Sequence, residues 1–142
     1  MTKSEHAVIL LHEGRKVLFV RRSASKKFMP HAWAFASGTI KKGEIPKQTA
    51  LREAKEELGL DVTIEKELFT IHLVLPDDWD AKLHVVLCAN TLNQPIVFDQ
   101  AEIQDYQFLT FGDFFKKYRD EEIDHVPRYL RNHPELWTTL LT

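Results

Sequence analysis

The pattern of apolar and polar residues predicts that most of the chain forms short β-strands. Residues 7–12 and 16–22 are rich in Val, Leu, Ile and Phe, which favours strands. Between them, Gly14 can adopt the positive φ of a hairpin turn. By the same pattern, further strands are expected at residues 33–36, 62–75, 82–91 and 103–109, with a loop at 23–31 and a polar turn at 76–80.

Three segments have the apolar spacing of helices. In the central one, Pro46 suits the first helical turn and Gly59 suits the C-terminal cap. Its expected buried stripe consists of Ala50, Leu51, Ala54 and Leu58. Further helices are expected at residues 111–118, with Thr110 as the N-cap, and at 134–141. Strands on both sides of a central helix, with helices late in the chain, predict an α/β fold with a mixed sheet between helices.

Length and charge narrow the functional classes. The 142 residues suit one domain, residues 1–142, which is long enough to bury roughly two thirds of its unfolded surface. The net charge of −2 gives no basic face for duplex nucleic acid or for a membrane surface. Cys88, the one cysteine, has no partner for an internal disulfide, and the N-terminal apolar run is too short for a signal peptide or membrane span. We therefore expect a cytoplasmic protein.

The central helix carries three glutamates on neighbouring positions. Glu53 lies three and four residues before Glu56 and Glu57, so all three share one side of the helix. At about 4 Å, two such charges repel by roughly 4 kcal/mol at an effective dielectric near 20. A hard divalent cation such as Mg²⁺ relieves this repulsion and is commonly shared with substrate phosphates. For Glu56 and Glu57 alone, a solvated acidic surface is the alternative.

The whole segment from residue 38 to 60 resembles the Nudix box. The residues in register are Gly38, Glu44, Arg52, Glu53, Glu56, Glu57, Gly59 and Leu60, with Ala54 at a position where the family usually has a larger apolar residue. The resemblance implies an α/β/α sandwich around a mixed sheet, with the box as loop-helix-loop. It also implies a hydrolase that uses Mg²⁺ or Mn²⁺ to cleave a pyrophosphate bond. The implied substrate is a nucleoside diphosphate linked to another moiety, such as a nucleotide sugar, ADP-ribose or a nucleoside di- or triphosphate.

The resemblance also implies roles for individual residues. Glu53, Glu56 and Glu57 would bind the metal, together with the main-chain carbonyl of Ser37, which stands where the family usually has glycine. Glu53 would also orient or deprotonate the attacking water, and Arg52 would hold Glu53. Gly38, Glu44 and Gly59 would be structural. Many family members use a later acidic residue as a general base; Glu102 is the candidate and Asp99 the fallback, the alternative being a loop carboxylate without a role.

The segment before the box resembles a second pattern. Arg22, Lys26, Pro30 and Trp33 match the Arg-x-x-x-Lys-x-x-x-Pro-x-x-Trp stretch of the Nudix branch related to isopentenyl diphosphate isomerase. Arg22 and Lys26 would then bind substrate phosphates, the alternative being a solvated basic loop. Trp33 either stacks on a base or packs the loop.

Two other functions stay open beside hydrolysis. An isomerase of that branch uses a cysteine just before the box, but residues 33–38 contain none, and Cys88 on a predicted strand suits a buried position. A non-catalytic, nucleotide-binding Nudix module is the second, although such modules typically lose box glutamates. His72 and His84 either face a substrate cleft or are bonded within the sheet. The expected partner is a small nucleotide-type diphosphate, and a homodimer is open because many relatives pair.

Overall fold

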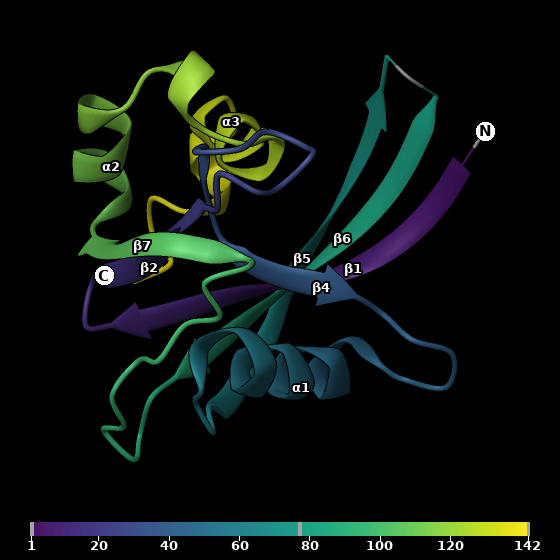
Figure 1. The fold of residues 1–142 in the computed structure, drawn as a ribbon. Coiled ribbons are helices and arrows are strands. Elements are labelled where there is room, and N and C mark those ends of the chain that lie inside the picture. Colours follow the sequence, from purple (N-terminus) through teal and green to yellow (C-terminus); the bar gives the residue numbers. More distant parts are fainter. Residues whose placement is uncertain (1, 77, 142) are drawn as a thin grey trace. The chain divides into compact units, whose positions relative to one another are not determined.

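The computed structural model describes residues 2–76 and 78–141 and divides the chain into two compact units. The first unit combines the chain up to Leu11 with Ala36–Val97, and the second combines His12–Phe35 with the chain from Phe98 onwards. Figure 1 shows the elements of both. No helix within these described residues is long and apolar enough to cross a membrane.

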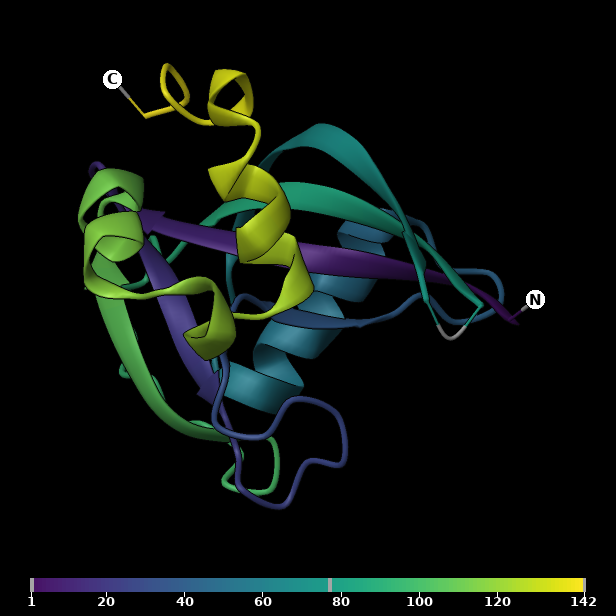
Figure 2. The same ribbon diagram turned by 90° about the horizontal axis from the view of Figure 1, so that it is seen from above.

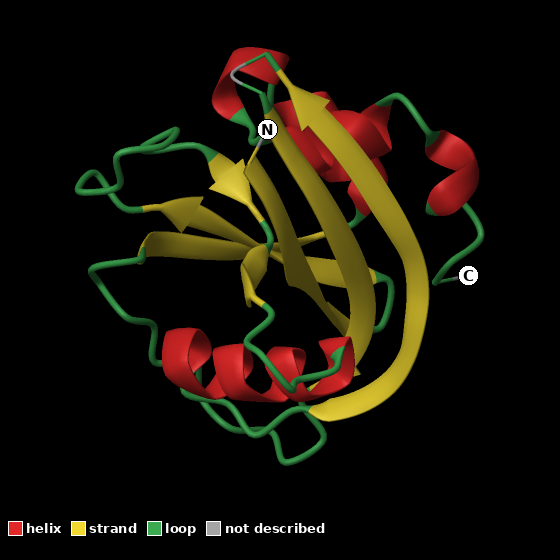
Figure 3. Ribbon diagram, turned by 90° about the vertical axis from the view of Figure 1, so that its right-hand side faces the viewer, coloured by secondary structure: helices red, strands yellow, loops and turns green. Residues whose placement is uncertain are grey.

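The first unit is built on three long strands and one helix. β1 (Thr2–Glu13) lies beside β6 (Trp79–Ala89), which pairs antiparallel with β5 (Thr63–Leu75). The short strand β4 (Ala36–Thr39) pairs antiparallel with β1, with Ala36 opposite Ile9 and Thr39 opposite His6. Helix α1 (Pro46–Leu58) follows β4 and contacts β4, β5 and β6. Figure 3 shows α1 as one continuous helix and the long strands as strongly curved.

The second unit is centred on β2 (Lys16–Arg22). This strand pairs with the last residues of β1, with β3 (Trp33–Ala34) and with β7 (Ile103–Leu109), all antiparallel. The remaining elements are α2 (Phe111–Lys117), η1 (Asp120–Glu122), α3 (His125–Arg131) and η2 (Pro134–Leu136). Figure 2 shows β2 and β7 side by side. The core of this unit is aromatic, because Phe19 of β2 stacks on Phe114 of α2 with ring centroids 3.7 Å apart.

Several local predictions are confirmed. Gly14 has a φ of 62° in the hairpin turn, and Gly59 caps α1 with a φ of 67°. Thr110 caps α2 by accepting a hydrogen bond from the Asp113 amide at 3.1 Å. β2 and β7 have the predicted bounds. The predicted strand at 33–36 is divided into β3 and β4 at Phe35.

Two of the predicted secondary-structure segments are wrong. β6 begins at Trp79, within the predicted turn at residues 76–80, of which Asp77 lies outside the described residues. The predicted helix at 134–141 is only the short 3-10 helix η2 followed by turns, whereas the helix of this region is α3. Pro127 inside α3 conceals the helix in the sequence, because proline usually ends a helix; here it lies in the first turn, where its missing N–H costs nothing.

Candidate active site

The buried face of α1 differs from the prediction at one residue. Its buried residues are Thr49, Ala50, Ala54 and Leu58. Leu51 is 43% exposed, so its predicted burial is wrong, and Thr49 is buried instead. Successive residues of a helix are about 100° apart around its axis. Burial of Thr49 in place of Leu51 therefore turns the buried face toward Glu53 and Glu57, which are both partly buried. The helix therefore directs two carboxylates inward rather than into open solvent.

Arg52 connects the box loop to the glutamates of α1. Its Nε donates to Glu44 Oε2 at 2.8 Å, and its Nη2 donates to Glu44 Oε1 at 2.9 Å and to the Thr39 carbonyl at 3.1 Å. Its Nη1 donates to Glu53 Oε1 at 2.7 Å and to Glu56 Oε2 at 3.3 Å. A planar guanidinium bound on three sides has little rotational freedom. The position of the Glu53 carboxylate is therefore fixed through Arg52.

Glu44 anchors this network in the loop before α1. Besides Arg52, it accepts hydrogen bonds from the Lys41 amide at 3.0 Å and the Thr49 hydroxyl at 2.9 Å. The hydrogen bond from Arg52, followed by that from the Lys41 amide, lowers the pKa of Glu44 to about 2. The same contact raises the pKa of Arg52 above its usual value. Both groups are therefore charged at neutral pH, and Glu44 joins the loop at Lys41 to Thr49 and Arg52 of α1.

Gly38 lies directly beneath the Glu53 side chain. A Cβ atom on Gly38 would lie 2.1 Å from Glu53 Cδ and 2.3 Å from Oε1, distances that no real contact has. Ser37, the preceding residue, lies in β4 opposite Val8 and has no positive φ. Serine is therefore accommodated here without backbone strain, and at the next position only glycine leaves the Glu53 side chain where it lies.

The three box glutamates differ in exposure. The side chain of Glu53 is 14% exposed and that of Glu56 is 55% exposed, while Oε2 of Glu57 is shielded from solvent. Among the described residues, no three His, Cys, Asp or Glu side chains form a ready-made metal cluster. Arg52 Nη1 contacts both Glu53 and Glu56, and the convergence of the three carboxylates on a metal stays a prediction. The donors are oxygen atoms only, which fits Mg²⁺ or Mn²⁺ in their chemistry.

In the second unit, the structure brings Lys26 and Glu102 together. Lys26 Nζ lies 2.5 Å from Glu102 Oε2. The backbone supports this pair, because the Ser23 amide donates to the Glu102 carbonyl at 3.0 Å and the Ser25 hydroxyl donates to the Ala101 carbonyl at 3.2 Å. Lys26 is therefore not a freely solvated lysine of a basic loop.

Arg22 and Trp33 have different environments in the same unit. Arg22 Nε donates to the Phe28 carbonyl at 2.9 Å, and its guanidinium lies 5.9 Å from the Phe28 ring centroid. Trp33 is 5% exposed and lies against Tyr118, with ring centroids 5.3 Å apart. Of the two roles open for Trp33, packing is the one that the structure favours.

Sequence reasoning missed Thr49 and the Thr39 carbonyl. Thr49 lies three and four residues before Arg52 and Glu53, so helical spacing alone places it beside both. The Thr39 carbonyl has no side-chain signal. Cys88 is fully buried, and burial, with a smaller contribution from Glu65, raises its pKa to about 12. That thiol is unsuited to the acid-base step of an isomerase.

Comparison with known proteins places this geometry in context. The family model described as NUDIX domain matches residues 1–130. An RNA pyrophosphohydrolase of Nitratiruptor sp. is 50% identical over 38 residues, covering 27% of this chain and 24% of that protein. An 8-oxo-dGTP diphosphatase of Proteus vulgaris is 37% identical over 60 residues, covering 42% of this chain and 54% of that protein. The matched segments thus span well under two thirds of these relatives.

A solved structure shows the same fold. The crystal structure of a MutT protein from Methanosarcina mazei Go1 superposes with a TM-score of 0.74 at 16% identity, covering 97% of this chain and 94% of that one. The predicted fold class, α/β with a mixed sheet and helices, is confirmed.

Proposed function

The chain is a member of the NUDIX family, and on that premise we propose that it is a divalent-metal-dependent pyrophosphohydrolase. Its substrate would be a small molecule with a nucleoside diphosphate linked to another moiety. The observation that carries the proposal is the Arg52 network, which joins Glu44 and the box loop to the Glu53 carboxylate. A purely structural surface helix has no need of a partly buried arginine that fixes one glutamate.

Glu53 is the proposed centre of the reaction. One of its oxygens accepts from Arg52 at 2.7 Å, which orients the carboxylate, and in this scheme the carboxylate would accept a proton from a water molecule. Arg52 is a positioning residue in this scheme, because it acts through Glu53. Gly38 leaves the space in which the Glu53 side chain lies.

The box residues would hold the metal. A Mg²⁺ or Mn²⁺ ion held by Glu53, Glu56, Glu57 and the Ser37 carbonyl would neutralise phosphate charge and lower the pKa of a bound water. Arg52 contacts both Glu53 and Glu56, so it limits how far these two carboxylates separate. Glu44 keeps Arg52 in place and contributes no ligand.

The second unit supplies the remaining proposed groups. Arg22 and Lys26 would bind substrate phosphates, since guanidinium and ammonium groups form charge-assisted hydrogen bonds with them. Glu102 would accept a proton as a second base. Because Lys26 and Glu102 form an ion pair, a phosphate that binds Lys26 would release the Glu102 carboxylate from its partner.

The names of the relatives suggest which substrates to try first. RNA and 8-oxo-dGTP are the substrates that appear in the names of two relatives. A panel with Mg²⁺ should add nucleoside di- and triphosphates, nucleotide sugars, ADP-ribose, dinucleoside polyphosphates and isoprenoid diphosphates. We expect phosphate or pyrophosphate release from at least one nucleotide and no isomerised isoprenoid.

Matched glutamate variants test the catalytic assignment. Glu53→Gln should lower kcat by about 10²–10⁴-fold, the range for loss of a general base. Glu67→Gln, an exposed glutamate of β5, is the control and should keep wild-type kcat. Equal activity of Glu53→Gln and wild type would contradict the proposal. Nucleotide binding by titration calorimetry without turnover across the panel would instead indicate a non-catalytic module.

Glu102 is tested separately on the best substrate. Glu102→Gln keeps the size and hydrogen-bonding capacity of the side chain but removes its charge. A lower kcat, with the pH-rate profile losing one ionisation, is expected of a second base. An unchanged kcat would remove Glu102 from the catalytic residues and leave the assignment of Glu53 intact.

A further inference from the structure

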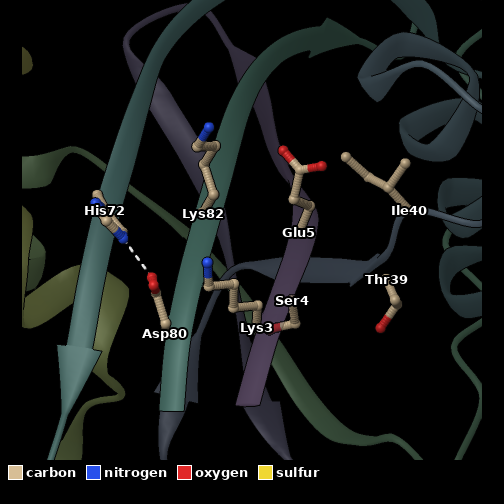
Figure 4. Close-up of a pocket in the computed structure, with 8 residues that line it drawn as sticks. All are labelled: Lys3, Ser4, Glu5, Thr39, Ile40, His72, Asp80 and Lys82. Atoms are coloured by element: carbon tan, nitrogen blue, oxygen red, sulfur yellow. Dashed lines mark hydrogen bonds and ion pairs between the residues drawn. The ribbon is translucent and has the colours of Figure 1, made fainter. Parts of the chain in front are cut away.

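The first unit contains a hollow of about 640 Å³ on the sheet beside the box loop. Figure 4 shows its lining residues, which come from β5, β6, β1 and the end of β4. They are Lys3, Ser4, Glu5, Thr39, Ile40, His72, Asp80 and Lys82. We call this hollow the Lys3–Lys82 pocket. It is large enough for several phosphate groups or a nucleotide.

The two carboxylates of the pocket are each bound by a histidine. His84 Nε2 lies 3.1 Å from Glu5 Oε1, and His84 Nδ1 lies 3.2 Å from the Thr70 hydroxyl. His72 contacts Asp80 through its Nε2 atom, as the dashed line in Figure 4 marks. Both histidines are therefore bonded within the sheet, which was one of the two roles that the sequence left open.

The two lysines have no such partners. Among residues 2–76 and 78–141, the structure records no hydrogen bond or ion pair for the ammonium group of Lys3 or of Lys82. Both side chains are exposed and belong to the pocket lining. The carboxylates of Glu5 and Asp80 are engaged by the histidines, so the two ammonium groups are the charged groups of the pocket that have no recorded protein partner among the described residues. A phosphate group suits two unpaired ammonium groups.

The pocket adjoins the box segment, because Thr39 and Ile40 belong to its lining. Thr39, which lines it, accepts from Arg52 Nη2 through its carbonyl at 3.1 Å. The residue before it is Gly38, on which the Glu53 carboxyl group lies. Consecutive Cα atoms are about 3.8 Å apart. Thr39, at the edge of the pocket, therefore lies next to the glycine that contacts the proposed catalytic carboxylate. The Ile40 amide donates to the Glu5 carbonyl at 3.0 Å and fixes this edge of the loop to β1.

We propose that the Lys3–Lys82 pocket binds the phosphates of the substrate that lie beyond the bond being cleaved. In this proposal, Lys3 and Lys82 contact the phosphate oxygens. The pocket thus selects substrates with a longer phosphate chain or a second nucleotide over nucleoside diphosphates. This inference rests on the proposed function for its role in turnover, but not for the binding of phosphate itself.

Binding is tested without metal, so that the box does not contribute through a bound ion. Inorganic tripolyphosphate is titrated into the protein in EDTA, with amide NMR shifts to locate it. Shift changes at residues 3–5, 39–40 and 80–82 are expected. In Lys3→Ala/Lys82→Ala the Kd should rise at least about tenfold, since one charged hydrogen bond contributes about that factor. Lys66→Ala, which removes an exposed lysine of β5, should bind as wild type does.

Kinetics separate this inference from the proposed function. For a substrate with three or more phosphates, Lys3→Ala/Lys82→Ala should raise KM about tenfold at unchanged kcat, with a smaller effect for a diphosphate substrate. Lys3→Arg/Lys82→Arg should restore KM. Turnover with KM unchanged in the alanine variant would overturn the pocket and leave the hydrolase assignment standing. If tripolyphosphate shifts the pocket amides but the protein turns over no substrate, the pocket is supported and the hydrolase assignment is contradicted. Shift changes confined to residues 22–28 would contradict the pocket.

Discussion

The box and the loop at residues 23–31 both hold charged side chains in defined contacts, but they use different parts of the chain. Arg52 finds its partners between Thr39 and Glu56, within one loop and one helix. Lys26 finds its partner at Glu102, and Ser25 bonds to Ala101, each 76 residues away. The first arrangement is encoded by local spacing, and the second exists only after the chain has folded.

The two arrangements also differ in how well they exclude solvent. The side chains of Arg52, Glu44 and Glu53 are 21%, 20% and 14% exposed. Those of Lys26 and Glu102 are 26% and 38% exposed, and one ion pair joins them. A network of several charge-assisted hydrogen bonds holds its geometry better than a single exposed pair does. The box should therefore be rigid and sensitive to substitution, and the loop should tolerate change.

Among the variants that test the contrast between the box and the loop, Gly38→Ala should have the largest effect. The added Cβ would lie 2.1 Å from Glu53 Cδ, so the Glu53 side chain must rotate away from Arg52. Displacing a catalytic group by about 1 Å can lower activity about 10²-fold. We expect a loss of that size in kcat on the best substrate, with the fold retained by circular dichroism because a side chain, not backbone, gives way.

Gly112→Ala in the second unit is the matched control. No atom lies within 4 Å of a Cβ at that position, which is inside α2. Alanine should raise the free energy of unfolding by up to about 1 kcal/mol and leave kcat unchanged. If Gly38→Ala retains wild-type kcat, the close approach of Gly38 and Glu53 has no part in activity.

The next largest effect is expected in the acid stability of the protein, to which the Glu44 carboxylate contributes. The pKa of this carboxyl is lowered from 4.5 to about 2 in the folded protein. Its stabilising contribution is therefore complete above pH 4.5 and is lost as the pH falls toward 2. Glu44→Gln should remove this part of the pH dependence, giving a flatter plot of unfolding free energy against pH in that window. Denaturant unfolding at a series of pH values measures it, with Glu67→Gln as the control.

The smallest effect is expected for the Lys26 and Glu102 pair. A double-mutant cycle with Lys26→Ala and Glu102→Gln should give a coupling free energy of about 0.2–1 kcal/mol, as for other exposed pairs. Urea unfolding of the four proteins provides the numbers. A coupling free energy above about 2 kcal/mol would mean that the loop is held as firmly as the box, and would contradict the expectation that the loop tolerates substitution.

The box shows how far local spacing leads. The positions of Glu53, Glu56 and Glu57 on one helix and the cap at Gly59 were accessible from residue spacing, whereas the structural role of Glu44 came only from the resemblance to the Nudix box. The burial of Leu51 was not, because the apolar stripe of a helix allows several arcs and only the packed sheet selects one. α3 was missed for a different reason: Pro127 looks like a helix breaker until its place in the first turn is known.

The sequence by itself determined the fold class, the central helix with its glutamates and most strand positions, because these depend on periodicity and on backbone preferences of nearby residues. Only the tertiary structure decided that Gly38 lies under Glu53, that Lys26 pairs with Glu102, and that Lys3 and Lys82 share a pocket with two histidine-bound carboxylates. Those contacts join residues from different strands and loops, and their distances are set by strand pairing, which no local pattern specifies.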